Sequence, residues 1–158
     1  MPRQRLLNCD FVEDSKFKVE LPNKAKLLYF YMFANADDRG FVGKTLELIK
    51  MLNDNDQDSG SFELAPYNYE NALYDLIQKG FIYEFKNSHG GKTHLIRHWY
   101  YHNHIYKKAF TNYGQYLKLV VLRNNEYVMK NDQLEVVETQ EEDTQDWDTM
   151  IKALDNGN

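Results

Sequence analysis

The sequence predicts a mainly helical α+β domain in which helices precede a two-stranded β-hairpin. Apolar residues recur with the 3.6-residue helical period in the N-terminal half of the chain. Two runs rich in β-branched and aromatic residues follow, and a polar turn that contains glycine separates them. The chain has 158 residues, of which 42% are apolar and 15% aromatic, enough for the hydrophobic core of one domain.

The first helix is expected after Leu21-Pro22-Asn23, and segment 37–40 ends it because Asp and Gly favour turns. We expect its core-facing stripe to follow the i, i+3, i+4, i+7 spacing: Leu27, Phe30, Tyr31 and Ala34. Residues 41–42 predict a short extended segment. Thr45 to Leu52 then predicts a second helix with three inward residues: Leu46, Ile49 and Leu52.

The third helix is expected over Asn68 to Lys79, and Gly80 follows at the position of a C-cap glycine. Its apolar stripe has five members: Tyr69, Ala72, Leu73, Leu76 and Ile77. The strand-like runs 81–85 and 93–99 flank a turn, 87–92, with the glycines that a hairpin requires. Helix, strand, helix, helix and hairpin in this order are typical of a winged helix-turn-helix whose wing is the hairpin.

The sequence changes character after the hairpin. Residues 100–108 are aromatic and basic, and residues 116–122 predict a short helix. Beyond Lys130 the chain is rich in Asp, Glu, Gln and Thr, which predicts a mobile acidic tail. We therefore expect a winged-helix domain with a basic extension over residues 1–127 and an acidic tail over residues 128–158.

Several classes of protein are excluded by what the sequence lacks. No apolar run approaches the ~18 residues of a membrane span, and no secretory signal pattern is present. Cys9 is the only cysteine, so an intramolecular disulfide or an all-cysteine zinc site cannot form, and we expect this thiol to be buried and inert. No phosphate-binding loop or hydrolase motif occurs. We expect a cytoplasmic protein that is not an enzyme.

Charge is distributed along the chain in three blocks. Residues 1–78 carry nine Lys and Arg against thirteen Asp and Glu, residues 79–130 carry nine against two, and residues 131–158 carry one against nine. The blocks have net charges of −4, +7 and −8, and the whole chain has −5. A basic segment between two acidic ones indicates a charged partner rather than a particular fold.

Two strings are the most specific features of the chain: Ala36-Asp37-Asp38 with Gly40-Phe41-Val42, and His98-Trp99 with His102-Asn103. Further residues fit the same pattern in register: Ser15, Phe17, Leu21-Pro22, Ala25, Leu28-Tyr29-Phe30, Leu76-Ile77, Lys79, Phe81-Ile82 and Ile105. From about Arg3 to about Tyr127 the chain resembles the N-terminal domains of phage replisome-organiser proteins, which are DnaD-like replication initiation proteins. The resemblance implies a winged helix that binds replication-origin DNA in a bacterial host cell, helps to load a helicase and forms a homodimer.

Candidate DNA contacts fall into three groups. The third helix of a helix-turn-helix lies in the major groove, where side-chain amides can pair with adenine, so its amide residues are candidates: Asn68, Asn71 and Gln78. Cations after this helix and around the hairpin are expected to bind phosphate: Lys79, Lys86, His89, Lys92, Lys107 and Lys108. Arg3 and Arg5 are expected to form a minor-groove arm. The alternative that the outward face of the third helix is only solvated stays open, because the carboxylates of Glu70 and Asp75 would be repelled by DNA phosphates.

Two clusters invite a chemical role that we do not favour. On one strand His94 and His98 would lie about 13 Å apart, too far to share a metal ion, so we expect neither a metal nor a cofactor. We expect His98 and His102 to hydrogen-bond the segment after the hairpin onto the domain. Asp37 and Asp38 are expected to close a turn rather than to act as paired catalytic carboxylates.

The sequence thus predicts a protein that binds double-stranded DNA in phage or prophage replication initiation, with a replication or host protein as a further partner. The alternative is a winged-helix protein-interaction module that binds or inhibits a host or phage protein through its acidic surfaces. The net charge of −5 and the acidic residues of the third helix favour this alternative.

Overall fold

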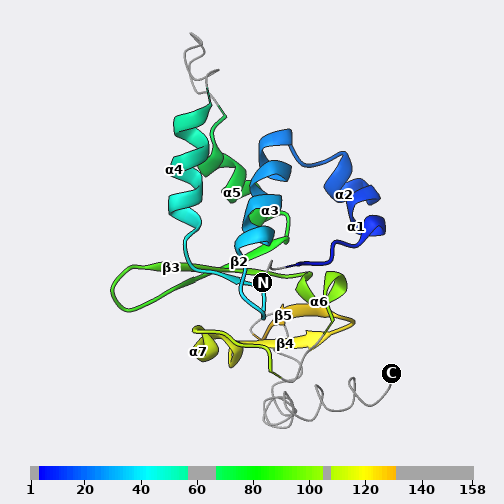
Figure 1. Cartoon of the computed structure of the whole chain (residues 1–158), viewed down its shortest axis with the longest axis vertical. Coiled ribbons are helices and arrows are strands. Elements are labelled where there is room, and N and C mark those ends of the chain that lie inside the picture. The colour runs from blue at the N-terminus through cyan, green and yellow to red at the C-terminus, as the bar shows by residue number, and fades with distance from the viewer. Residues whose placement is uncertain (1–3, 57–66, 105–107, 131–158) are drawn as a thin grey trace.

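The computed structural model describes residues 4–56, 67–104 and 108–130, and they form an α+β fold (Figure 1). The helices are α1 (Cys9–Glu13), α2 (Ser15–Lys18), α3 (Asn23–Asn35), α4 (Thr45–Asn55), α5 (Tyr69–Gln78), α6 (Trp99–His102) and α7 (Gly114–Leu117). The strands are β1 (Phe41–Val42), β2 (Ile82–Lys86), β3 (Lys92–Ile96), β4 (Val120–Arg123) and β5 (Glu126–Met129). Arg3, Lys107 and the acidic tail beyond residue 130 lie outside the described residues.

A three-stranded antiparallel sheet in the order β1–β3–β2 forms the centre of the fold. The expected hairpin is confirmed as β2–β3, but the sheet has one strand more than expected because β1 also pairs with β3. Phe41 lies opposite Leu95, and Val42 lies opposite His94. The two-residue strand that follows the first helix is therefore an edge of the same sheet as the hairpin.

Both faces of this sheet are covered (Figure 1). Helices α3, α4 and α5 lie on one side of it, and α7 with the β4–β5 hairpin lies on the other. On the α7 side Phe85 stacks on Tyr116 with ring centroids 4.9 Å apart, and Phe41 lies 5.7 Å from Tyr113. Because alternate residues of a strand point to opposite faces, the hairpin contributes to two apolar layers at once.

The segment after the hairpin differs from the expected helix over residues 116–122. Helix α7 ends at Leu117, and the antiparallel pair β4–β5 follows. Asn124 and Asn125 both have positive φ, 51° and 64°, which is the backbone of a tight hairpin turn that asparagine tolerates. The hydroxyl of Tyr127 donates to the carbonyl of Arg39 (2.7 Å), so this hairpin is anchored to the turn before β1. Strand β5 runs to Met129, past the boundary expected at residue 127.

Helix α3 turns a different face to the core from the one that the sequence pattern predicts. Its buried residues are Ala25, Leu28, Tyr29, Met32 and Phe33. Leu27 and Tyr31 of the predicted stripe are 41% and 39% exposed. The reason is that α3 is apolar around most of its circumference, so that two different stripes have helical spacing.

The other helices match the sequence more closely. The stripe predicted for the third helix is confirmed in α5, where Tyr69, Ala72, Leu73 and Leu76 are buried. In α4 Ile49 and Leu52 are buried as expected, whereas Leu46 is exposed and Thr45 takes the inward position. Cys9 is exposed, contrary to the expectation of a buried thiol. In the described part of the chain no helix has both the length and the hydrophobicity to cross a lipid bilayer.

The predicted turn after α3 is confirmed, and Asp37 closes it. Its Oδ1 accepts from the backbone N–H groups of Arg39 (2.9 Å) and Phe41 (3.0 Å). Gly40 has φ +93°, and a Cβ atom there would lie 2.7 Å from Cγ of Trp99. This turn therefore needs both a side-chain acceptor and a glycine, and it brings the end of α3 against the start of α6.

Substitutions of adjacent leucines test which face of α3 is buried. Leu28→Ala is expected to lower the free energy of unfolding by about 2–5 kcal/mol, because it leaves a cavity in the core. Leu27→Ala is expected to cost less than about 1 kcal/mol, because this side chain is half-exposed. Urea unfolding followed by circular dichroism measures both values. Equal losses for the two variants would contradict the burial of the Leu28 face.

Candidate nucleic-acid interface

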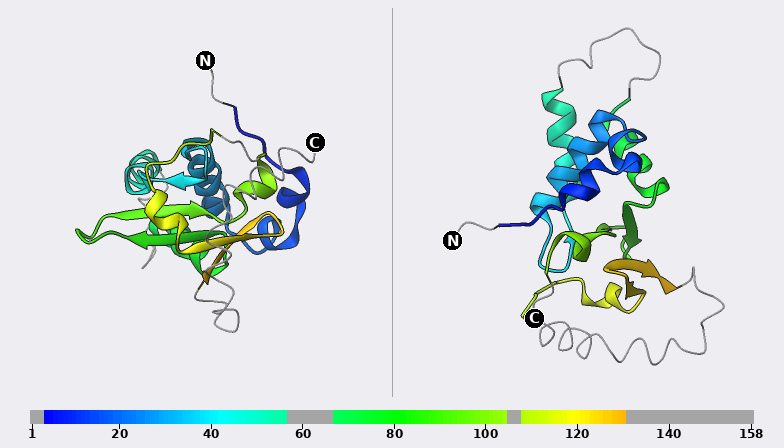
Figure 2. Two further views of the ribbon diagram at one scale, coloured as in Figure 1. Left: turned by 90° about the horizontal axis from the view of Figure 1, so that it is seen from below. Right: turned by 90° about the vertical axis from the view of Figure 1, so that its right-hand side faces the viewer.

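The hairpin tip, residues 86–92, projects away from the helices and from the β4–β5 sheet (Figures 1 and 2). Asn87 orders it, because its Oδ1 accepts from the backbone N–H groups of His89 (2.9 Å) and Gly91 (2.7 Å). Gly90 has φ +83°, and a Cβ atom there would have no neighbour within 4 Å. The tip is thus held by its own side chain and backbone, and it leaves room for another molecule to approach.

Two lysines lie directly opposite each other at the base of this tip. Lys86 and Lys92 are the last register pair of the hairpin, and both are exposed. Directly opposed side chains share one face of a sheet and lie close together, so two like charges at this position repel each other. Lys92 is only partly neutralised, by Glu84 with 3.8 Å between Nζ and Oε1, and among the described residues Lys86 has no ion pair. An anion placed between them would relieve this repulsion.

A buried polar chain connects the hairpin to α4. The Nδ1 atom of His94 lies 2.8 Å from Oγ1 of Thr45, and its Nε2 lies 3.0 Å from Oε2 of Glu84. Burial lowers the pKa of His94, and the hydrogen bond to Glu84 only partly opposes this. Since a carboxylate can only accept, neutral His94 donates from Nε2 to Glu84 and accepts at Nδ1 from the Thr45 hydroxyl.

This order of hydroxyl, imidazole and carboxylate is the one found in nucleophilic catalysis. Here it is structural, because Thr45 and His94 are fully buried and no substrate could reach the hydroxyl. These hydrogen bonds among Thr45, His94 and Glu84 fix the hairpin against the N-terminal end of α4. They also hold Glu84 beside Lys92, which sets the charge at the base of the tip.

Helix α5 presents a poor face for reading bases. Asn68 and Asn71 form a reciprocal capping box, in which each side chain accepts from the other residue's backbone N–H at 3.0 Å. Their amide oxygens are thus used to cap the helix, and the contact of these residues with adenine stays a prediction. Gln78 is exposed as a base contact would need to be, but Glu70 and Tyr74, which is 63% exposed, share the surface of this helix.

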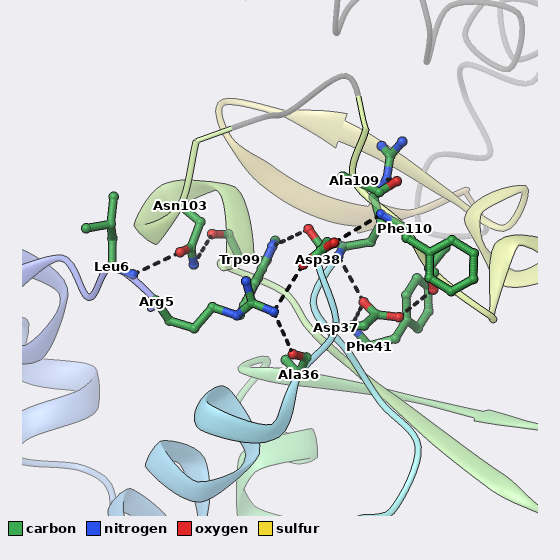
Figure 3. A network of polar contacts seen from close by, with 12 residues as sticks. Arg5, Leu6, Ala36, Asp37, Asp38, Phe41, Trp99, Asn103, Ala109 and Phe110 are labelled. Atoms are coloured by element: carbon green, nitrogen blue, oxygen red, sulfur yellow. Dashed lines mark hydrogen bonds and ion pairs between the residues drawn. The ribbon is translucent and has the colours of Figure 1, made fainter. Parts of the chain in front are cut away.

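Arg5 is held against the domain and does not form the expected arm (Figure 3). Its Nη2 donates to the carbonyl of Ala36 (3.1 Å) and to Oδ1 of Asp38 (3.2 Å). Its guanidinium carbon lies 5.3 Å from the ring centroid of Trp99, and the side chain is only 16% exposed. Asn103 holds the next residue in place by accepting from the backbone N–H of Leu6 (3.0 Å). Arg5 therefore ties the N-terminal segment to the start of α6.

Two further predicted cations that the structure describes, Lys79 and Lys108, lie away from the hairpin tip. Lys79 is exposed at the C-cap of α5, beside a cavity of about 340 Å³ that also borders Arg97. Lys108 is exposed beside a second cavity of about 330 Å³ that also borders Arg5 and Asp38. Among the predicted DNA contacts that it describes, the structure thus brings together Lys86, His89 and Lys92, and it places Lys79 and Lys108 elsewhere.

The histidine expectations are confirmed for His102. Its Nδ1 accepts from the backbone N–H of Asn8 (2.9 Å), and its Nε2 lies 3.1 Å from the hydroxyl of Tyr29. His98 lies 3.7 Å from Glu126, and its Nδ1 is buried without a hydrogen-bond partner among the described residues. Across the described ranges no group of three or more His, Cys, Asp or Glu side chains is placed to hold a metal ion.

Sequence reasoning missed the polar chain of Thr45, Glu84 and His94. A signal was present for Glu84, because it is the one charged residue of the strand run 81–85. The pairing of Glu84 with His94 depends on the register of the hairpin, in which they are direct cross-strand partners. The contact with Thr45 depends on how α4 packs on the sheet, and no local pattern predicts that.

The buried histidines predict that stability falls in mild acid. Burial lowers the pKa of both His98 and His102 from 6.5 to about 4. Between pH 6.5 and about 4 the unfolded chain therefore binds more protons than the folded one, so this part of the stability is present above pH 6.5 and is lost as the pH falls. We expect a loss of up to roughly 1.4 kcal/mol per pH unit for each histidine, measured by urea unfolding.

A substitution identifies the source of this dependence. His102→Gln is expected to flatten the profile between pH 6.5 and 4.5, whereas His89→Gln, at the exposed hairpin tip, is expected to leave it unchanged. If His102→Gln does not fold, the Cε1 proton of His102 in the wild-type protein supplies a direct NMR titration. A midpoint near pH 6.5 would contradict the prediction.

Comparison with known proteins adds no relative to this picture. No protein-family model, no curated protein and no solved structure matches the chain. The resemblance to replisome organisers therefore stays a prediction.

Proposed function

We propose that this chain binds double-stranded DNA through the hairpin tip and acts in phage or prophage replication initiation. The observation that carries the proposal is the exposed, face-to-face pair Lys86 and Lys92 at the base of a projecting turn. Two cations that repel each other gain most from a polyanion that passes between or beside them. The link to replication comes from the sequence resemblance to replisome organisers.

The order of the elements supports a winged-helix mode of binding. Helix α3, strand β1, helices α4 and α5 and hairpin β2–β3 follow one another, and the sheet order is β1–β3–β2. In a winged helix-turn-helix these would be the three helices and the wing, with the hairpin tip beside the DNA backbone. The Thr45–His94–Glu84 chain then holds the wing in a constant position relative to the helices.

The chemistry of the surface favours contacts to phosphate over contacts to bases. The hairpin tip offers lysines and open backbone, whereas α5 offers Glu70, Tyr74 and two asparagines that are occupied as caps. Lysine contacts to phosphate release counterions and give affinity with little sequence information. We therefore expect weak, salt-sensitive binding to duplexes of any sequence.

Neutralising the lysine pair tests this function. The double variant Lys86→Gln/Lys92→Gln is expected to weaken binding to a random-sequence duplex by about ten-fold at low salt, because two phosphate contacts are lost. The slope of log affinity against log salt is expected to fall by about 1.8. Fluorescence anisotropy of a labelled duplex at four or more salt concentrations measures both quantities.

The matched control is Lys50→Gln, compared with Lys86→Gln. Lys50 is exposed on α4 and lines a shallow surface with Glu47 and Asp54, so its removal changes the net charge equally but not the hairpin tip. Affinity lost equally in both single variants would indicate a general charge effect and not a wing contact. No binding of a duplex at low salt, by either the full chain or a chain that ends at residue 130, would refute the DNA proposal itself.

A second candidate function is a protein-interaction module for a basic host or phage protein. The observation that favours it is the exposed surface of α5, where Glu70 and Tyr74 have no neighbouring exposed lysine or arginine within the helix. In this case the substitution Glu70→Lys would weaken the partner complex and leave any residual DNA binding unchanged or stronger. Capture of partners with the wild-type and Glu70→Lys proteins in parallel separates the two functions.

A further inference from the structure

The basic segment of the chain has no carboxylates left to neutralise its exposed lysines. Residues 79–130 contain only two acidic residues, Glu84 and Glu126. Glu84 is shared between Lys92 and His94, and Glu126 pairs with Arg97 at 3.2 Å. Among the described residues no carboxylate forms an ion pair with the following exposed lysines of this segment: Lys79, Lys86, Lys108 and Lys118.

The same chain carries a matching excess of acid directly after this segment. Residues 131–158 contain nine Asp and Glu against one Lys. The densest part is Glu141-Glu142-Asp143, and Glu138 precedes it. Such a segment offers the carboxylates that the lysine pair of the hairpin tip lacks, in the way that the phosphates of DNA would.

The acidic segment has enough length to reach the hairpin tip. Glu142 follows Lys130 by twelve positions, which an extended chain spans with roughly 40 Å. A domain of this size has a radius of gyration of about 14 Å, so that a path over its surface between opposite sides is roughly 55 Å. The 28 residues of the segment 131–158 span roughly 90 Å when extended, which is enough to follow such a path. A segment tethered to the domain acts at an effective concentration of the order of 1 mM. At this concentration even weak ionic contacts form part of the time.

We propose that residues 131–158 bind to the hairpin tip and compete there with DNA. The contact is ionic, between carboxylates of this segment and the pair Lys86 and Lys92. This contact goes beyond the proposed function, because it would regulate the hairpin tip that the proposal assigns to DNA. The expected effect on DNA affinity rests on the proposed function. Since the contact is screened by salt, competition is strongest at low ionic strength and fades toward 0.5 M.

Carbodiimide cross-linking of the full-length protein without DNA tests the contact directly. This reagent forms an amide directly between a carboxylate and a lysine amine, without a spacer, so it favours pairs that are in contact. Peptides that link the acidic segment to Lys86 or Lys92 are expected in clear excess over links to Lys50, which is exposed on α4. Addition of 0.5 M salt is expected to abolish the excess. Equal links to all three lysines would overturn the proposal.

Affinity measurements on full-length variants test the competition. Glu138→Gln/Glu141→Gln/Glu142→Gln removes three charges from the acidic segment, and it is expected to bind a random duplex about 2- to 10-fold more tightly at low salt. The matched control removes three exposed charges from the domain: Glu20→Gln/Glu47→Gln/Asp54→Asn. An equal gain in both variants, or no gain in the first, would overturn the proposed competition.

The two assays separate failure of this inference from failure of the proposed function. Cross-links to the hairpin tip, in a protein that binds no DNA even with Glu138→Gln/Glu141→Gln/Glu142→Gln, would leave the ionic contact standing and refute the DNA function. DNA binding that depends on Lys86 and Lys92, in a protein without these cross-links, would refute the contact and leave the DNA function standing.

Discussion

Strand β3 is the element on which the rest of the structure depends, because it pairs along both edges and is covered on both faces. It joins β1 to β2, so that a strand from the N-terminal half and the hairpin form one sheet. On one face His94 meets Thr45 at the start of α4, and on the other the Phe85–Tyr116 stack brings α7 underneath. Apolar burial on two sides is what a small domain needs to hold a projecting hairpin in one orientation.

Burial on both faces also explains where charged side chains lie along the β2–β3 hairpin. The base of the hairpin has to be apolar or fully paired, and its two polar residues, Glu84 and His94, are used on each other. Lys86 and Lys92 lie at the hairpin tip, where the helices and the β4–β5 hairpin no longer cover the sheet (Figure 1). There the register sets Lys86 opposite Lys92, and Glu84 only partly relieves the repulsion between them, which would favour a bound anion at this position. The proposed function and the proposed competition by the acidic segment both follow from this one geometry.

Local patterns predicted much of the chain where a single physical rule applies. The stripe of α5, the turn closed by Asp37 and the hairpin turn around Asn87 are all confirmed, because each depends on residues within a few positions of one another. The face of α3 was predicted wrongly, since both of its sides are apolar. The role of Arg5 was predicted wrongly as well, because its partners Asp38 and Trp99 are distant in sequence.

The sequence by itself determined where helices and turns occur and how charge is distributed, because periodicity, glycine positions and composition are properties of short segments. The tertiary structure decided which stripe of α3 is buried, that β1 joins the hairpin, and that Asn53 accepts from the backbone N–H of Tyr69 where α5 begins. It also decided that the two lysines of the hairpin stand face to face. These features depend on register and packing between segments far apart in the chain, and no local pattern contains that information.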